Sequence, residues 1–397
     1  MISTVYIEKT VYGGDGLGRL GDGRVIFVPG AFAGEEIKAE IAAEKKHFVK
    51  GRLVEVVKPS PDRLASPDPS VPGMVYAALS AHGEQTAKEA QLHDFFARAR
   101  IPVGKFGPSA APAHFLNYRN KVVYHFARQK GAWVLGYREE PAHAIVDITN
   151  DPLARPEINA QLETIRQQAF ALLSQGAPNV RRAVERQANL TVRWSSVSGV
   201  RWWMGEPPAQ AVMREATCKR IFEVPAGGFY QVNPEVGETL VRSVVDEYAQ
   251  KAVRAPEVID LYCGVGVFGL SCRPPKLLGI ESGREAVAFA RRNAAAQQMA
   301  NATFRMGQIE HMRKALPAAE QATLIIDPPR GGLGPGVAEA LLRLRVPYIF
   351  YVSCDPATLL RDLRKLTANY DVESVRWFNM FPRTARFETF AVLVRRG

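Results

Sequence analysis

The stretch Val258-Ile259-Asp260-Leu261-Tyr262-Cys263-Gly264-Val265-Gly266-Val267-Phe268-Gly269 decides the fold of this chain. It begins as an apolar run typical of a buried strand and continues into a glycine-rich turn, after which a helix can begin. Glycines in such a turn let backbone amides approach a ligand closely. The pattern GxGxxG fits a dinucleotide-binding protein equally well when it stands alone.

Strand-like and helical segments alternate around this stretch, from about residue 227 to the end of the sequence. The strand-like runs are residues 257–262, 277–280, 323–326 and 348–352. This alternation predicts a doubly wound α/β sheet, a Rossmann-like architecture that binds ligands beyond the carboxyl ends of its strands.

Acidic residues at the strand ends favour S-adenosylmethionine as the ligand. Asp260 precedes the glycine loop, and Glu281 ends the next strand, where its carboxylate can accept both ribose hydroxyls. Glu281 would serve NAD in the same way, so the choice depends on Asp327-Pro328-Pro329-Arg330 after the fourth strand. Nucleic-acid methyltransferases place such a turn beside the methyl donor. A proline-rich turn with an exposed Asp327 is the alternative.

Cys354 follows the strand-like run 348–353, and Asp355-Pro356 then opens a helix with an N-cap residue and proline at N1. A thiol at this junction is expected to feel the helix amino terminus, which favours the thiolate, although Asp355 opposes this effect. A lone cysteine at a strand end is more often a small buried apolar residue.

Uracil chemistry gives such a cysteine a use. Carbon 5 of uracil becomes nucleophilic when a thiolate adds to carbon 6, and a base must then remove the carbon 5 proton. Glu388 lies in an apolar run near the chain end, where burial would raise its pKa. The alternative is an ion pair with Arg383 or Arg386, which would lower that pKa.

The rest of the chain divides into two further parts. Residues 1–58 alternate short β-branched runs with glycine turns and predict a small β-barrel, and residues 45–52 interleave basic and aromatic side chains as a single-strand nucleic-acid surface does. Residues 59–226 predict a central α+β domain, which begins with an irregular segment. The predicted elements are helices at 84–100 and 155–174, a hairpin at 117–137 and a strand pair at 190–204. Part of 84–110 is expected to pack on the catalytic domain, residues 227–397.

Composition agrees with this division. A chain of 397 residues exceeds one core of ordinary size, so two or three domains are expected. Its 51 Lys and Arg against 40 Asp and Glu give a net charge of +11, which suits a polyanion but also an ordinary basic surface. With no apolar signal core and no run of roughly 18 apolar residues, we expect a cytoplasmic protein without a membrane partner.

The cysteines predict neither a disulfide framework nor a metal site. The four are Cys218, Cys263, Cys272 and Cys354, and no two form a CxxC pair. In a reducing compartment they should be free thiols.

Six ordered motifs make the whole chain resemble the RNA uridine-5-methyltransferase family, whose members methylate tRNA or 23S rRNA. They are residues 117–121 (NYRNK), 229–233 (FYQVN), 260–264 (DLYCG), 327–330 (DPPR), 353–356 (SCDP) and 381–388 (FPRTARFE). The first 58 residues resemble its TRAM RNA-binding domain through residues 14–18 (GDGLG), 28–30 (VPG) and 34–35 (GE). The resemblance implies S-adenosylmethionine as cofactor, rRNA or tRNA as partner, and a monomer.

The resemblance also implies roles for individual residues. Cys354 would be the nucleophile and Glu388 the base. The donor or the uracil would be held by Gln231, Tyr262, Glu281 and Asp327, and the glycine loop adds Gly264 and Gly266. Candidate RNA contacts are Arg119, Lys121 and Arg330.

The sequence departs from the family pattern at several positions, and each departure predicts a difference in cofactor content or in the site. Many members hold an iron–sulfur cluster by four cysteines. Residues 65–74 contain none of them here, and Asp151 stands where the fourth would be. We predict no cluster, with ordinary packing holding this region. Val267 replaces a common asparagine and removes a polar contact to the donor, while Arg386 replaces a usual histidine beside Glu388.

Two other functions compete with this one. A methyltransferase acting on an exocyclic base amine also uses an Asp-Pro-Pro turn but needs no covalent cysteine. A catalytically silent RNA-binding protein or folding factor would keep the barrel, and the presence of both Cys354 and Glu388 argues against it.

Overall fold

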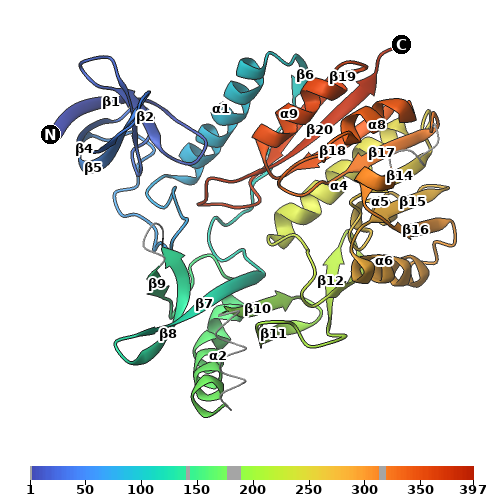
Figure 1. The fold of residues 1–397 in the computed structure, drawn as a ribbon, viewed down its shortest axis with the longest axis horizontal. Helices are drawn as coiled ribbons and strands as arrows, with labels where there is room; N and C mark the ends of the chain where they lie inside the picture. The colour runs from blue at the N-terminus through green and yellow to red at the C-terminus, as the bar shows by residue number, and fades with distance from the viewer. Residues whose placement is uncertain (1, 140–143, 177–188, 313–318) are drawn as a thin grey trace. The chain divides into compact units, whose positions relative to one another are not determined.

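The computed structural model describes residues 2–139, 144–176, 189–312 and 319–397 (Figure 1). The chain forms two compact units. One contains Met1–Arg100 together with Asn379–Phe387, and the other contains Ile101–Phe378 together with Glu388–Gly397. The division at residues 58 and 226 stays a prediction.

The first unit begins with the predicted barrel, which is confirmed. Its strands are β1 (Ile2–Thr10), β2 (Gly16–Arg19), β3 (Val25–Val28), β4 (Glu36–Glu44) and β5 (Val49–Lys58), closed in the order β1-β2-β3-β5-β4. Alternate side chains, among them Val5, Ile7 and Ile26, fill its interior. Gly18 is required for this closure, because a Cβ there would lie 2.4 Å from the Tyr6 carbonyl oxygen. The barrel is thus a closed core of its own.

An irregular segment and a helix follow the barrel. Helix α1 (Ala81–Ala99) begins where the Ser80 side chain accepts a hydrogen bond from the Gly83 amide at 2.9 Å, three residues earlier than predicted. Arg100, with φ 54°, ends it. The buried face of α1 carries charged residues as well as Leu92 and Phe96.

The second unit begins with an α+β region, as predicted. Five antiparallel strands lie in the order β11 (Gly199–Met204), β10 (Asn189–Ser195), β7 (Lys121–Gln129), β8 (Ala132–Glu139) and β9 (Ala144–Asp147). Helix α2 (Pro156–Gln175) contacts β10 and β11, and β12 (Val212–Thr217) pairs with β13 (Arg220–Pro225). Both predicted hairpins and the helix are confirmed.

A buried carboxylate holds part of this region together. Asp151 is fully buried and accepts hydrogen bonds from the hydroxyls of Tyr124 at 2.9 Å and Tyr137 at 2.6 Å, and from the Leu153 amide at 2.9 Å. The expectation of ordinary packing here is incomplete, because a hydrogen-bonded centre joins β7 and β8 to the segment before α2. We call it the Asp151 centre.

The main sheet is doubly wound, which confirms the predicted fold class. Its order is β16 (Ala302–Met306), β15 (Leu277–Glu281), β14 (Glu257–Leu261), β17 (Ala322–Ile326), β18 (Tyr348–Ser353), β20 (Glu388–Arg395), β19 (Tyr370–Phe378) and β6 (Val103–Phe106). The first five strands are parallel, whereas β20 runs antiparallel to β18 and β19. Strand β6, from the 84–110 segment, pairs with β19.

Helices connect these strands on both faces of the sheet (Figure 1). They are α4 (Pro234–Lys251), α5 (Val267–Cys272), α6 (Arg284–Ala296), α7 (Ile309–Met312), α8 (Val337–Leu344) and α9 (Pro356–Leu366). Within the described residues, no helix combines the length and apolar character of a membrane span.

Candidate active site

A pocket lies beyond the carboxyl ends of β14 and β17. It collects four of the six residues predicted to hold the donor: Gln231, Tyr262, Gly264 and Asp327. The remaining lining residues come from the β12 end, the 229–241 segment and the glycine loop: Thr217, Phe229, Tyr230, Pro234, Gly237, Glu238, Val241, Cys263, Val265, Val267 and Phe268. The lining therefore joins segments far apart in sequence.

The glycine loop turns through left-handed backbone at Tyr262, Gly264 and Gly266, where φ is 60°, 53° and 85°. A Cβ at Gly264 would meet no atom within 4 Å, so its backbone is open to a ligand. The Gly264 amide donates to the Glu281 carboxylate at 3.2 Å, and the Gly283 amide donates to the same carboxylate at 2.7 Å. Glu281 therefore lies against the loop, although it is not among the lining residues.

Asp260 anchors this loop from behind. It is fully buried, and one of its carboxylate oxygens accepts the Gly269 amide of α5 at 2.9 Å. The other oxygen has no hydrogen-bond partner among the described residues. Burial raises the pKa of Asp260 to about 7, and the Asp327 and Glu281 carboxylates add to the effect. Asp260 thus fixes the loop and does not line the pocket.

The Gln231 segment is held by two residues to which sequence reasoning gave no role. The Asn120 side chain donates to the Gln231 carbonyl at 3.2 Å, and its backbone amide donates to the Val232 carbonyl at 2.9 Å. Arg193 is buried, pairs with Glu215 at 2.9 Å and donates to backbone carbonyls between residues 225 and 228. The sequence did offer a sign of this role of Arg193, namely an arginine at an inward-facing position of a predicted strand.

Arg119 and Lys121, predicted to contact RNA, are half-buried and hold internal partners. Burial opposes the charge of Arg119, but Tyr118, Tyr137 and Asp151 nearby raise its pKa. Lys121 donates to the Gly227 carbonyl at 3.3 Å. Burial, with Arg193 adding to it, lowers the pKa of Lys121 to about 8. Their contact with RNA stays a prediction.

Strand register brings Cys354 and Glu388 together. In the antiparallel pair β18 and β20, Ser353 stands opposite Thr389, whose hydroxyl donates to the Ser353 carbonyl at 3.0 Å. Cys354 directly follows the last residue of β18 and Glu388 is the first residue of β20, so the thiol lies near the carboxyl, whose charge adds to the raised pKa of the thiol. Glu388 is 4% exposed and Cys354 is half-buried, so the carboxylate is screened from water where the thiol is not.

Charges around this pair favour its neutral forms. Burial raises the pKa of Cys354 to about 11, and the Glu388 and Asp327 carboxylates add to the effect. Burial also raises the pKa of Glu388 well above its ordinary value, with Asp327 adding to it. The exposed Arg330 lowers both pKa values. Burial alone raises the pKa of Asp327 to about 7.

One electrostatic expectation needs correction and another is confirmed. The pKa of the Cys354 thiol is raised rather than lowered, chiefly by burial, and the amides of Ala357 and Thr358 at the start of α9 donate to the Asp355 side chain at 3.0 and 3.1 Å. Arg383 pairs with Asp68 at 2.6 Å and with Glu84 at 3.4 Å. The expectation that burial raises the pKa of Glu388 is confirmed, and the alternative, a pKa lowered by an ion pair, is not.

The four cysteines are all free thiols. Among the described residues, no group of three or more His, Cys, Asp and Glu side chains is placed to hold a metal ion. The expectation that the chain carries no iron–sulfur cluster stays a prediction.

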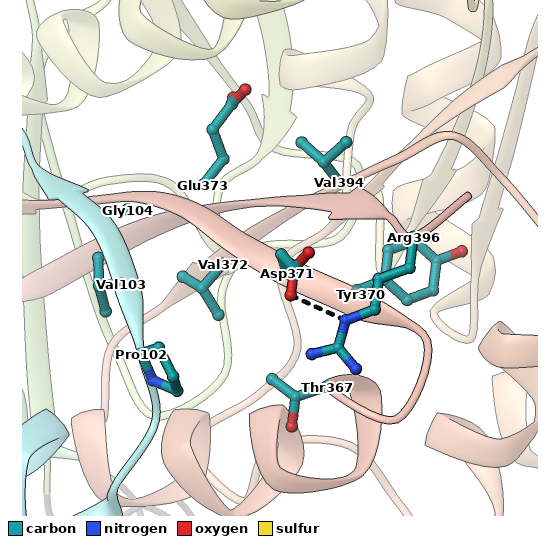
Figure 2. A pocket seen from close by; sticks show the side chains of 10 residues that line it. All are labelled: Pro102, Val103, Gly104, Thr367, Tyr370, Asp371, Val372, Glu373, Val394 and Arg396. Carbon is teal, nitrogen blue, oxygen red and sulfur yellow. Dashed lines mark hydrogen bonds and ion pairs between the residues drawn. The ribbon is translucent and has the colours of Figure 1, made fainter.

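A separate pocket lies at the other edge of the main sheet (Figure 2). It is lined by Pro102, Val103, Gly104, Thr367, Tyr370, Asp371, Val372, Glu373, Val394 and Arg396. Figure 2 shows Asp371 and Arg396 joined across it by an ion pair of 2.8 Å. None of the predicted site residues lines this pocket, so it is not part of the candidate site.

The doubly wound sheet, the glycine loop with Glu281 against it and the Asp-Pro-Pro turn define a methyltransferase of the S-adenosylmethionine-dependent class. Residues 208–396 match the family model of the tRNA (uracil-5-)-methyltransferases, and residues 2–54 match the TRAM domain. The chain is 30% identical to an uncharacterized RNA methyltransferase of Thermosynechococcus vestitus, over 98% of this chain and 96% of that protein. The chain belongs to the RNA uracil-5-methyltransferase family and is an S-adenosylmethionine-dependent enzyme of it.

Other similar proteins agree with this assignment. The 23S rRNA (uracil(1939)-C(5))-methyltransferase RlmD of Methylococcus capsulatus is 28% identical, over 98% of this chain and 96% of that protein. The fold is shared with the tRNA (uracil-54, C5)-methyltransferase of Pyrococcus abyssi, solved in complex with S-adenosyl-L-homocysteine. That structure has a TM-score of 0.74 and 23% identity, and the match covers 99% of both chains.

Proposed function

We propose that this enzyme methylates carbon 5 of a specific uridine in RNA through a covalent bond between the Cys354 sulfur and carbon 6, with Glu388 as the base. The observation that supports the proposal is the end of the β18–β20 pairing, because Cys354 directly follows Ser353 and Glu388 directly precedes Thr389, the last pair of that register. A methyltransferase acting on a base amine would have no use for this pair.

The residues would act in sequence on the uracil ring. Addition of the Cys354 thiolate to carbon 6 forms the C–S bond and moves the ring electrons to an enolate, so that carbon 5 becomes a nucleophile. After carbon 5 has been methylated, the Glu388 carboxylate takes its proton. The C–H electron pair restores the carbon 5 to carbon 6 double bond, and the thiolate leaves. The net products are methylated uridine, S-adenosylhomocysteine, which S-adenosylmethionine becomes when its S–CH3 bond breaks, and one proton on Glu388.

The pocket residues fit S-adenosylmethionine, which supplies an electrophilic methyl group when bound. The open backbone at Gly264 and the turn at Gly266 suit close approach of a ligand. The Glu281 carboxylate would accept ribose hydroxyls, and Gln231, Tyr262 and Asp327 would contact the donor or orient the uracil. No polar side chain stands at position 267 to replace the common asparagine.

Arg330 would control the protonation of the acceptor side. It is exposed, and it is the cation that lowers the pKa of both Cys354 and Glu388. Both groups must be ionised at their own step, so an arginine that favours both charged forms supports the thiolate and the base alike. The same exposed guanidinium would contact RNA phosphate.

The RNA would be rRNA or tRNA, as the names of the relative and of the structural neighbour suggest. The barrel would position it through exposed basic residues such as Lys45, Lys46 and Lys50. Arg119 and Lys121 would add contacts from the central region. We propose a cytoplasmic enzyme that acts as a monomer.

Incubating the protein with total RNA that lacks modifications and with labelled S-adenosylmethionine tests this function. Mapping the labelled nucleotide should give one 5-methyluridine at a fixed position, and RNA with 5-fluorouridine there should trap the enzyme as an adduct stable to denaturant. A label on an exocyclic amine, or no label in any RNA, would overturn the proposal.

A further inference from the structure

The loop Asn379–Phe387 joins β19 to β20 and ends immediately before Glu388. Both flanking strands belong to the second compact unit, but the loop itself belongs to the first. The residue proposed as the base therefore follows directly on a segment that is held by the amino-terminal part of the protein. The contacts that hold this loop are unusual in being buried and charged.

Glu84 and Lys88 form the centre of these contacts. They lie one turn apart on α1, their side chains are 0% exposed, and the ammonium nitrogen is 2.7 Å from a carboxylate oxygen. Lys88 also donates to the Asn379 side-chain oxygen at 2.7 Å and to the Phe381 carbonyl at 3.2 Å. The Asn379 amide donates to Glu84 at 3.0 Å. We call Glu84, Lys88, Asn379 and Arg383 the loop anchor.

Arg383 completes the loop anchor in a left-handed conformation, with φ 66°. Its backbone amide donates to both carboxylate oxygens of Glu84 at 3.0 Å. Its guanidinium donates to the Leu79 carbonyl at 2.6 Å, and its own carbonyl accepts the Tyr76 amide at 3.1 Å. A residue other than glycine rarely adopts this backbone conformation unless its surroundings impose it. The loop anchor therefore fixes the path of the loop.

Burying charged side chains costs desolvation free energy, and apolar residues of similar size can stabilise a fold equally well. The charged groups instead restrict the loop to one conformation, because each donor and acceptor has a defined partner. The end of the loop is also fixed. Phe387, the residue before the base, is fully buried and packs edge-on against Tyr12 with ring centroids 5.9 Å apart.

We propose that Glu84 and Lys88 are positioning residues for the methyl-transfer reaction, because through the loop anchor they set the start of β20 and so the place of the Glu388 carboxyl. This inference rests on the proposed function of Glu388. The amino-terminal unit then contributes to the proton-removal step through the chain itself, in addition to any contact that it makes with RNA.

The double variant Glu84→Gln/Lys88→Met tests the proposal in the full-length enzyme. It nearly keeps the volume of both side chains and removes both charges of the Glu84–Lys88 pair together, while the buried Arg383 keeps its ion pair with Asp68 at 2.6 Å. Asn379→Ala is a milder second variant. Asp94→Asn on the same helix is the matched control, because within the described residues Asp94 forms ion pairs only with the partly exposed Lys9 and the exposed Arg98.

The readout separates adduct formation from proton removal. With RNA carrying tritium on carbon 5 of uridine, one measures the rate at which the denaturant-stable adduct forms and the rate of tritium release to water. The double variant should form the adduct at nearly the normal rate and release tritium at least tenfold more slowly, so that the adduct accumulates. Asn379→Ala should shift the same ratio in the same direction, and Asp94→Asn should leave it unchanged.

Three results would overturn the inference. One is a normal ratio of the two rates in either folded variant, another is an equal loss of both rates, and the third is a shifted ratio in the Asp94→Asn control. Glu388→Gln is measured in parallel. If it too fails to accumulate adduct, the proposed role of Glu388 is wrong, whereas accumulation in Glu388→Gln alone removes only the role of the loop anchor.

Discussion

The donor side and the acceptor side of the active site are built differently. The proposed donor side consists of backbone amides in the glycine loop and of the Glu281 and Asp327 carboxylates at the ends of β15 and β17, whereas Asp260 of β14 anchors the loop from behind. The proposed acceptor side consists of two side chains: Cys354, which directly follows β18, and Glu388, the first residue of the antiparallel strand β20. Backbone amides and strand-end carboxylates suit binding, while a thiol near a buried carboxyl suits bond making and proton transfer. Substitutions on the donor side should therefore weaken donor binding, and substitutions on the acceptor side should slow the reaction itself.

The largest effect should come from Cys354→Ala. Methylation should fall to the background rate, since no other group on the acceptor side can add to carbon 6, while the affinity for S-adenosylmethionine should be nearly unchanged. Calorimetric titration with the donor and a methyl-transfer assay measure the two properties. Near-normal turnover would show that carbon 5 is methylated without covalent help, or that another base atom is the target.

Glu388→Gln should slow turnover by about 10²–10⁴-fold, the usual contribution of a general base, and should leave adduct formation intact. The adduct with natural RNA should then accumulate on a denaturing gel. Fast turnover without adduct would assign the base to another residue.

The same variant should be more stable than the wild type at neutral pH. The folded-state pKa of Glu388 is raised above its ordinary value of 4.5, so the stability that the protonated acid contributes is lost as the pH rises from that value through the raised pKa. A neutral amide suffers no such loss. Chemical denaturation at pH 4 and pH 7.5 should show a gain for the variant only at the higher pH.

On the donor side, Glu281→Ala should weaken S-adenosylmethionine binding by roughly 10- to 100-fold, as expected for loss of a charge-assisted hydrogen bond. At saturating donor, the rate of adduct formation should approach that of the wild type. An equal loss of rate at saturation would mean that the two sides are not separable.

A smaller effect should appear in the pH profile. Because the pKa of Cys354 is about 11, the single-turnover rate at saturating RNA and donor should rise with pH between 7 and 9, by up to about tenfold per unit. Arg330→Ala removes the cation that lowers this pKa, so its profile should move toward alkaline pH. A profile flat from pH 7 to 9 in both proteins would show that thiolate formation does not limit the rate.

The smallest effect should come from the barrel. The triple variant Lys45→Gln/Lys46→Gln/Lys50→Gln should reduce the slope of log K for RNA against log salt by roughly 0.7 to 0.9 for each lost phosphate contact, with donor affinity unchanged. Lys38→Gln is the control, since Lys38 pairs with Glu55 on the same barrel at 2.8 Å. An unchanged slope would show that these lysines do not contact RNA phosphate, and Arg119 and Lys121 would become the better candidates.

The strand, glycine turn and helix of the proposed donor side could be predicted from the sequence because they are local. A strand, a glycine turn and a helix follow one another within residues 257–272, and Glu281 and Asp327 each end a neighbouring strand. Alternating segments were sufficient to predict the doubly wound sheet, and short β-branched runs were sufficient for the barrel. Hydrophobic periodicity predicts these strands and helices, because it is a pattern among residues that are close together in the sequence.

The acceptor side could be named from motifs, but its geometry could not be derived. Cys354 and Glu388 meet only through the register of β18 with β20, and register depends on pairing between distant segments. The raised pKa of the Cys354 thiol depends first on burial and then on carboxylates from separate segments, chiefly Glu388 and Asp327, so the nearby helix was a poor guide. The membership of residues 379–387 in the amino-terminal unit likewise depends on long-range contacts with Glu84 and Lys88.

The Asp151 centre makes part of the central sheet independent of redox conditions. Carboxylate and phenol groups contain no atom that is readily oxidised, unlike thiolates or iron, so air does not break their hydrogen bonds. Burial raises the pKa of Tyr124 and Tyr137, and both phenols therefore remain donors to Asp151 in alkaline solution. An enzyme that uses this centre to join β7 and β8 can be purified aerobically and assayed at high pH without loss of that connection.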